Sequence, residues 1–229
     1  MEISDILKNI RKEGRNFLLY TEAKKLLDIW NIPTAPSKIA MDQEGAVQAA
    51  LSVGFPVVMK IFLPDVVHKS DSGGVIIDLR TEKEVIQAFN KMMDNFRKVK
   101  PTVRIEGVII EKMLSGLEVI IGVTKDSQFG HVLMFGMGGI FVELLRDTSF
   151  RLIPLEPVDA KEMIKEVKGY PLLEGYRGQK GNIESLIDLL LKVSNLIVRY
   201  PEIFEMDLNP VFTFSSGSIA ADARIIIGK

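Results

Sequence analysis

The chain has 229 residues, of which 47% are hydrophobic and 26% charged, and its formal net charge is -1. This balance indicates a folded globular protein of one domain or two small ones, and it excludes a disordered chain. The near-neutral charge gives no electrostatic sign of nucleic-acid binding. Because cysteine is absent, disulfide scaffolds, thiolate zinc sites and cysteine nucleophiles are excluded too.

No targeting or membrane segment is evident in the chain. No apolar run approaches the roughly 20 residues of a membrane-spanning helix. The first residues, Met1 to Leu7, lack the basic-then-apolar order of a secretory signal. We therefore expect a cytoplasmic protein with no membrane partner.

The first half of the chain predicts helices alternating with strands. Ile3, Ile6, Leu7 and Ile10 recur at helical spacing and predict a short amphipathic helix. Three further helix starts are expected from capping residues, at Thr21, at Asp42 with Gly54 as its end, and at the capping box Thr81 to Glu84. Apolar strands are expected at 57–59 and 75–77.

The second half predicts an antiparallel sheet with two helices. The expected strands are 107–111, 118–124, 131–135, 141–143, 206–214 and 219–223. A helix is expected to start near Asp159 and to end at Gly169 and Pro171. A longer helix is expected after Asn182. The order of elements predicts a mixed α/β (α+β) fold.

The loop between the strands at 57–59 and 75–77 has the composition of a phosphate-binding loop. Gly73 and Gly74 let backbone N–H groups surround an anion, and Lys60 and Lys69 add positive charge. His68 strengthens this interpretation, because a neutral imidazole can attack a phosphoryl group and carry it covalently. A plain hairpin with solvated lysines is the alternative for this stretch alone.

Acidic and amide side chains gather near the end of the chain. Antiparallel pairing about the turn at Ser215 to Ser218 would bring Asn209 close to Asp222. An amide oxygen and a carboxylate suit Mg²⁺, which keeps most of its waters and bridges to phosphates. Polar residues flanking a turn are the alternative. A phosphate loop together with a cation site favours phosphoryl transfer.

These motifs together resemble a known family. The chain is similar over nearly its whole length to the ATP-grasp β subunit of ADP-forming acyl-CoA synthetases (acetate–CoA ligase, ADP-forming), relatives of the succinyl-CoA synthetase β chain. The matching segments are Val57 to Lys60, His68 to Val75, Phe135 to Glu143 and Asp207 to Pro210. The histidine segment combined with Asp207, Asn209 and Pro210 is the specific part.

The resemblance implies a single ATP-grasp domain over residues 1–229, built as two α/β lobes with a nucleotide cleft between them. The lobes would comprise about 21–106, and 1–20 with 107–229. The implied nucleotide-binding residues are Lys60, Ser72, Gly73, Gly74, Glu111, Lys112, Met113, Leu114 and Glu118. Of these, Lys60 and the N–H groups of Ser72 to Gly74 would contact phosphates, the backbone from Glu111 to Leu114 adenine, and Glu118 ribose.

The same resemblance assigns the catalytic and metal residues. His68 would be phosphorylated transiently, with Asp207 beside it, and Asn209 and Asp222 would bind Mg²⁺. A carboxylate bonded to one ring nitrogen would fix which nitrogen attacks. Magnesium is the implied cofactor, and ATP or ADP the implied substrate.

Some residues depart from the family pattern or stay unassigned. His131 stands where a proline is usual and is expected to be structural, and Leu63 replaces a common serine. Glu143 and Arg151 follow the glycine loop Gly136–Gly139, and phosphate contacts or surface ion pairs explain them equally well.

No dinucleotide-type glycine motif for coenzyme A and no carboxylate pocket is found, so a partner α subunit is implied, in an α2β2 assembly. The predicted function is the nucleotide-handling subunit of an ADP-forming acyl-CoA synthetase, in which phosphoryl passes through His68 to Mg-ADP. The alternatives are another ATP-grasp carboxylate ligase acting through an acyl phosphate, and a non-catalytic nucleotide-binding regulatory subunit.

Overall fold

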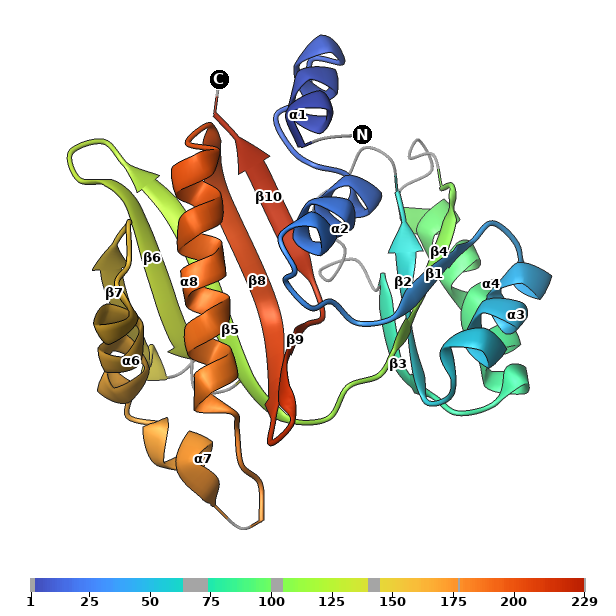
Figure 1. Ribbon diagram of the computed structural model, residues 1–229. Coiled ribbons are helices and arrows are strands. Elements are labelled where there is room, and N and C mark those ends of the chain that lie inside the picture. The colour runs from blue at the N-terminus through green and yellow to red at the C-terminus, as the bar shows by residue number, and fades with distance from the viewer. Residues whose placement is uncertain (1–2, 64–73, 100–104, 140–144, 177, 229) are drawn as a thin grey trace. The chain divides into compact units, whose positions relative to one another are not determined.

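The computed structural model describes residues 3–63, 74–99, 105–139, 145–176 and 178–228 (Figure 1). The chain forms two compact units. The large unit comprises Met1–Thr34 and Ser115–Lys229, and the small unit comprises Ala35–Leu114. Each has its own hydrophobic core and is described by itself.

The small unit is an antiparallel sheet covered on one face by two helices (Figure 1). Its strand order is β1-β4-β2-β3. The elements are β1 (Ser37–Ala40), α3 (Gln43–Val53), β2 (Val57–Phe62), β3 (Val75–Leu79), α4 (Glu82–Val99) and β4 (Gly107–Lys112). Val57, Met59 and Ile61 point from β2 into a core that includes Met92 and Phe96 of α4. Because side chains alternate along a strand, Lys60 lies on the opposite face.

The predicted caps of the small unit are present, with one difference. The Asp42 carboxylate accepts a hydrogen bond from Gly45 N at 2.7 Å, and Gly54 ends α3 with a φ of 86°. Thr81 Oγ1 accepts from Glu84 N at 3.2 Å. The Glu84 carboxylate accepts a hydrogen bond from Arg80 N and not from Thr81 N, so the predicted capping box is only half formed.

The large unit is a six-stranded antiparallel sheet with α6 and α8 on one face (Figure 1). The strand order is β10-β8-β5-β6-β7, and β9 pairs with β8. The strands are β5 (Leu117–Asp126), β6 (Gly130–Met137), β7 (Thr148–Leu152), β8 (Ile203–Phe214), β9 (Gly217–Ala220) and β10 (Ala223–Ile227). The helices are α1 (Ile3–Lys12), α2 (Tyr20–Ile29), α6 (Pro157–Glu166), α7 (Tyr170–Gly175) and α8 (Ile183–Arg199).

One core joins the helices of the large unit to one face of its sheet. The α8 residues Leu186, Leu189, Leu190, Val193 and Ile197 are buried there, as are Ile3, Ile6, Leu7 and Ile10 of α1. The amphipathic first helix is therefore confirmed. Asn182 caps α8 as predicted, because its Oδ1 accepts from Ser185 N at 2.9 Å.

The two units divide at other residues than the predicted lobes. The predicted limits were 21 and 106, whereas contacts divide the chain after Thr34 and after Leu114. Ala23, Leu26 and Leu27 of α2 belong to the core of the large unit. Strand β4, which follows the predicted limit at 106, pairs with both β1 and β2 and so belongs to the small sheet.

Three element predictions are corrected by local hydrogen bonding and register. The helix predicted from Asp159 begins at Pro157, because Asp159 Oδ2 accepts from Glu156 N at 2.9 Å and Glu156 is the cap. That helix ends at Glu166, and Pro171 lies inside α7. The last predicted strand, 219–223, is split into β9 and β10. The strand predicted at 141–143 lies outside the described residues.

Candidate functional site

The small unit carries a buried ion pair on the sheet face opposite its helices. Lys60 Nζ lies 2.8 Å from Glu111 Oε1, and only 6% of Lys60 and 3% of Glu111 is exposed. The pair joins β2 to β4, since Val58 is opposite Glu111 and Lys60 opposite Ile109. A buried cation held by a hydrogen-bonded carboxylate has a fixed position.

The segment that follows Glu111 is held through both backbone and side chain. Lys112 N donates to Pro36 O at 2.8 Å, and Met113 N donates to Pro56 O at 3.1 Å. The Lys112 ammonium donates to the carbonyls of Gly54 and Phe55 at 2.9 and 2.8 Å, so this cation fixes the α3–β2 turn.

Leu114 comes next and ends the small unit. Within the described part of the chain, neither its N–H nor its C=O makes a hydrogen bond. Both backbone groups of Leu114 can therefore be used by a ligand.

Glu118, the predicted ribose contact, belongs to the large unit. It is exposed on β5, and its carbonyl accepts from Gly138 N at 2.8 Å. A Cβ at Gly138 would lie 2.8 Å from Glu118 Cβ, too close for any residue but glycine. Gly139 has a φ of 59°. The described end of the glycine loop thus sets the surroundings of the Glu118 side chain.

The predicted acid and amide residues come together on the last strands. Leu208 is opposite Ala223, and Pro210 O accepts from Ala221 N at 2.9 Å, so the register places Asn209 opposite Asp222. Leu208 lies in the core. Asp207 and Asn209 therefore lie on the sheet face opposite α6 and α8, which we call the open face.

The electrostatic surroundings of Asp207 disfavour its charged form. Burial raises the pKa of Asp207, nearby Glu205 raises it further, the Arg224 guanidinium lowers it, and Asp222 adds a smaller increase. Arg224 is opposite Asp207 on β10, and its Nη1 lies 3.5 Å from Glu205 Oε1. Arg224 was missed by sequence reasoning, although its place two residues after Asp222 was a usable signal.

Several predicted residues lie outside the described ones. These are His68, Ser72 and Gly73, together with Glu143. Gly74 is described, and its carbonyl accepts from Ile61 N at 2.8 Å at the start of the β2–β3 hairpin.

Comparison with known proteins identifies the family. A family model described as an ATP-grasp domain matches residues 9–227. The β subunit of acetate–CoA ligase [ADP-forming] I from Pyrococcus furiosus is 47% identical over 225 residues, which cover 97% of each chain. The chain belongs to the ATP-grasp β subunits of ADP-forming acetate–CoA ligases. It is thus a ligase subunit, and the predicted fold and family are confirmed.

Two other relatives of this ligase β subunit are a much longer protein and a protein whose structure has been solved. Acetate–CoA ligase [ADP-forming] II from Archaeoglobus fulgidus is 49% identical over 213 residues, which are 93% of this chain and only 30% of that one. The dinucleotide-forming acetyl-coenzyme A synthetase 1 of Ca. Korarchaeum cryptofilum, in complex with coenzyme A and Ca-AMPCP, is 44% identical with a TM-score of 0.92, covering 99% of this chain and 100% of that one. In another complex of that protein, with Mg-AMPPCP, a phosphohistidine segment points towards the nucleotide binding site.

Two further side chains of the ligase β subunit are structural: His131, as expected, and Arg151, which the sequence left open. His131 Nε2 lies 2.8 Å from Ile203 O, which confirms its structural role. Arg151 Nη1 donates to the Glu166 carboxylate of α6 at 2.9 Å, and this bond raises the pKa of Arg151. The ion-pair explanation of Arg151 is therefore the one observed.

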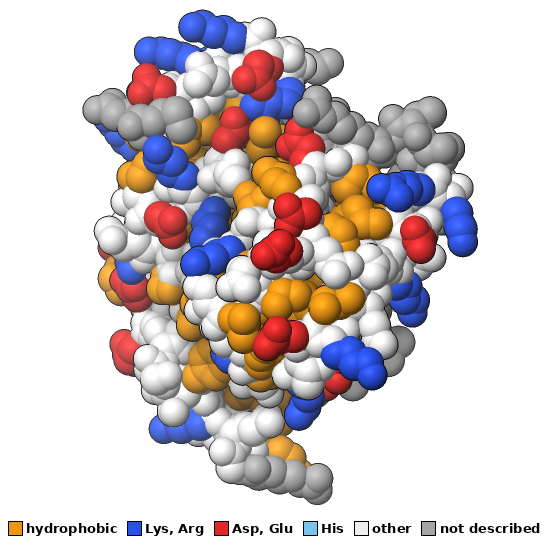
Figure 2. Space-filling view, turned by 90° about the vertical axis from the view of Figure 1, so that its right-hand side faces the viewer, with side chains coloured by type: hydrophobic (Ala, Val, Ile, Leu, Met, Phe, Trp, Pro, Cys, Tyr) orange, Lys and Arg blue, Asp and Glu red, His pale blue; other side chains and the backbone are white. Residues whose placement is uncertain are grey.

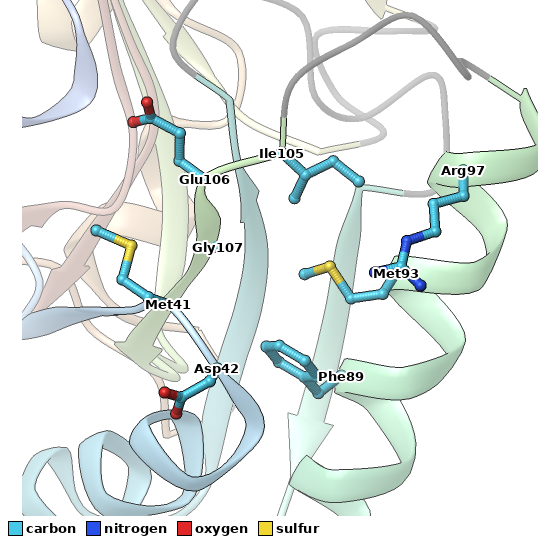
Figure 3. A pocket seen from close by; sticks show the side chains of 8 residues that line it. All are labelled: Met41, Asp42, Phe89, Met93, Arg97, Ile105, Glu106 and Gly107. Atoms are coloured by element: carbon cyan, nitrogen blue, oxygen red, sulfur yellow. The ribbon is translucent and has the colours of Figure 1, made fainter.

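The remaining surface features of the ligase β subunit do not add to this site. A pocket of about 380 Å³ in the small unit is lined by Met41, Asp42, Phe89, Met93, Arg97, Ile105, Glu106 and Gly107, none of them a predicted site residue (Figure 3). Acidic and basic side chains are mixed on the face shown in Figure 2. Among the described residues there is no cluster of three His, Cys, Asp or Glu for a metal. No described helix is both long and apolar enough to cross a bilayer.

Proposed function

We propose that this chain is the nucleotide-handling subunit of an ADP-forming acyl-CoA synthetase. Acyl-CoA and phosphate would react on a partner α subunit, releasing free acid and coenzyme A and leaving the phosphoryl group on a histidine. The phosphoryl group would then pass to His68 and on to ADP, making ATP. The observation that carries the proposal is the cluster of Asp207, Asn209 and Asp222 on the open face.

In this proposal the small unit binds the nucleotide. Lys60, held by Glu111 at 2.8 Å, places one fixed positive charge for phosphate oxygens. The N–H and C=O of Leu114 have the donor and acceptor pattern needed for an adenine edge. Lys112 and Met113 contribute by holding that backbone in place, since their own N–H groups are already bonded.

The large unit would supply the ribose and metal contacts. The exposed Glu118 carboxylate suits ribose hydroxyls. Asn209 and Asp222 fit Mg²⁺, because the register places an amide and a carboxylate opposite each other, and Mg²⁺ needs only one or two protein oxygens beside its waters. When bound there, Mg²⁺ would supply positive charge against the phosphate oxygens.

His68 and Asp207 would carry the covalent step. An imidazole with an ordinary pKa of about 6.5 is mostly neutral at pH 7 and hence nucleophilic. Asp207 would hold one ring nitrogen, so that the other attacks phosphorus. Intact mass after incubation with Mg-ATP tests this role. We expect an acid-labile phosphate on the wild type and none on His68→Asn, and equal labelling of both would refute the assignment.

Calorimetry of Mg-ADP binding tests the metal pair. Asn209→Ala and Asp222→Ala should each weaken the affinity, because each removes an oxygen ligand. Asp188→Ala is the matched control, since Asp188 lies on α8 and pairs with Lys192. Affinities equal to the control would remove both residues as ligands.

The proposal also includes a partner subunit and a cellular location. The longer Archaeoglobus relative, of which this chain matches only 30%, supports an α partner for this chain. An α2β2 assembly and a cytoplasmic location stay predictions. Co-purification with a tagged chain, followed by mass measurement of the complex, would test the assembly.

A further inference from the structure

Four apolar side chains form a strip on the outer strands of the large sheet. Phe150 and Leu152 of β7 are 56% and 52% exposed. Val132 and Met134 of β6 are half-buried and lie opposite Leu152 and Phe150. We call these four residues the β6–β7 strip. Two large apolar side chains left more than half exposed on one strand, beside two half-buried ones on its neighbour, are typical of an interaction surface.

The strip lies on the open face of the sheet. The residues between its members point the other way, because Ser149 Oγ donates to Met163 O of α6 at 2.7 Å and Arg151 bonds Glu166 of α6. On β6, Leu133 and Phe135 lie in the core. Helix α6 therefore covers the opposite face, and it cannot cover the strip.

The strip is continuous with the acid and amide cluster. Across the sheet, Phe150 is opposite Met134, Met134 is opposite Gly122, and Gly122 is opposite Asp207. Gly122 has no side chain, and a Cβ there would lie 3.1 Å from Met134 Cε, so the methionine covers the glycine. One row of residues thus leads from the exposed edge at Phe150 directly to Asp207.

From this row we infer that the β6–β7 strip is the docking surface for the partner α subunit, at the segment that carries the phosphoryl group towards the acid and amide cluster. The inference rests on the proposed function. The partner is the occupant because something outside this chain must supply that group. In the Archaeoglobus relative, the match covers only 30% of the chain, so a much larger part of the protein accompanies the matched part there. A segment reaching Asp207 from the β7 edge would cross Phe150 and Met134 first.

Binding of the purified α subunit to chains altered in the strip tests the inference. The double variant Phe150→Ser/Leu152→Ser should bind the α subunit at least about tenfold more weakly, as expected for apolar anchors of an interface. The matched control is Phe129→Ser/Val198→Ser, which removes side chains that are 66% and 55% exposed outside the strip. It should bind like the wild type.

Two further measurements separate the possible failures. Mg-ADP affinity of the isolated chain should be the same in the wild type and the strip variant; if the wild type itself binds no nucleotide, the proposed function fails and not the strip. Equal α binding by strip variant and control overturns the inference. So does a loss of self-association in the strip variant alone, which would make a second copy of this chain the occupant. If the double variant unfolds, Leu152→Asn provides the same comparison.

Discussion

Lys60 shows how one residue is positioned by its neighbours and not by its own sequence motif. Its ammonium could have been a solvated lysine at the end of a hairpin, but it lies 2.8 Å from Glu111 and is almost fully buried. Burying a charge is costly unless a partner compensates it. The pair therefore ties the proposed phosphate contact to the segment proposed to hold adenine.

Replacing Lys60 by methionine should destabilise the protein strongly. The change leaves the Glu111 carboxylate buried without its cation, which typically costs about 3–5 kcal/mol. The double variant Lys60→Met/Glu111→Leu should lose clearly less, because no uncompensated charge remains. Urea unfolding of the three proteins checks this, and a double variant no more stable than the single one would contradict it.

Asp207 gives a pH dependence whose sign follows from its raised pKa. The folded protein binds a proton at this carboxyl more tightly than the unfolded chain does. Its stabilising contribution is therefore present below the unfolded pKa of about 3.9 and is lost as the pH rises through the raised folded value. Asp207→Asn should thus be more stable than the wild type at pH 7, and this gain should vanish near pH 4. Urea unfolding without Mg²⁺ at the two pH values measures it; an equal difference at both would contradict the assignment.

At the residue scale, hydrogen bonds between residues close in the sequence could be predicted, whereas contacts between residues far apart could not. Asp42 and Asn182 were predicted as caps because a cap bonds an N–H three residues away. The roles of Lys112 and Arg224 depend on groups about 57 and 19 residues away, at Phe55 and Glu205. No spacing in the sequence announces such a contact.

Among the elements, the link between α1 and α2 is fastened to the edge of the large sheet. Leu18 N donates to Ile225 O at 3.0 Å and Ile227 N donates to Asn16 O at 2.7 Å. Arg15 closes the link, since its guanidinium bonds the Glu22 carboxylate with two nitrogens at 3.0 and 2.9 Å. The first two helices are therefore part of the large unit.

Arg15→Met should loosen this link. The change removes both hydrogen bonds to Glu22 from a side chain that is only 12% exposed. Hydrogen bonds to charged groups contribute about 1.5–3 kcal/mol to the free energy of unfolding. Arg80→Met is the control, because its pair with Asp78 is 69% exposed on the arginine side and solvent screens such surface pairs. Urea unfolding should rank the two variants in this order, and equal losses would contradict it.

Element types were predicted better than element limits. Apolar periodicity identified α1, α8 and most strands of both sheets, because burial dictates that periodicity, but it missed the short strands β1 and β7. The start of α6 was misplaced by two residues, since Asp159 is the third residue of the helix and accepts a hydrogen bond from Glu156 N instead of standing at the cap. Strand β8 begins at Ile203, three residues earlier than predicted.

For the molecule as a whole, the proposed nucleotide residues belong to both units. Lys60 and Leu114 lie in the small unit, and Glu118, Asn209 and Asp222 lie in the large one. Hydrogen exchange with and without Mg-ADP should therefore show protection in peptides from both. We expect it around β4 and its exit, and in β8. Protection confined to one unit would contradict the assignment.

The division into units was the hardest feature to predict. Helix α2 precedes a small-unit strand and β4 precedes a large-unit strand, so position in the chain misled in both cases. The unit to which α2 belongs is decided by the core that buries Leu26. The unit to which β4 belongs is decided by the strands that pair with Ile110. Both depend on contacts between residues far apart in the sequence. The resemblance to a family supplied the fold where periodicity could not.

The register that β8 keeps with β9 and with the start of β10 makes the length of a distant turn matter. Phe214 opposite Gly217 and Leu208 opposite Ala223 follow the same one-to-one register. Deleting a single serine between Phe214 and Gly217 would slide the returning chain by one place and turn Asp222 towards the helices. Surface turns normally drift in length over evolution. This turn should tolerate substitutions but not a deletion, because its length determines the direction in which Asp222, five positions after Gly217, points.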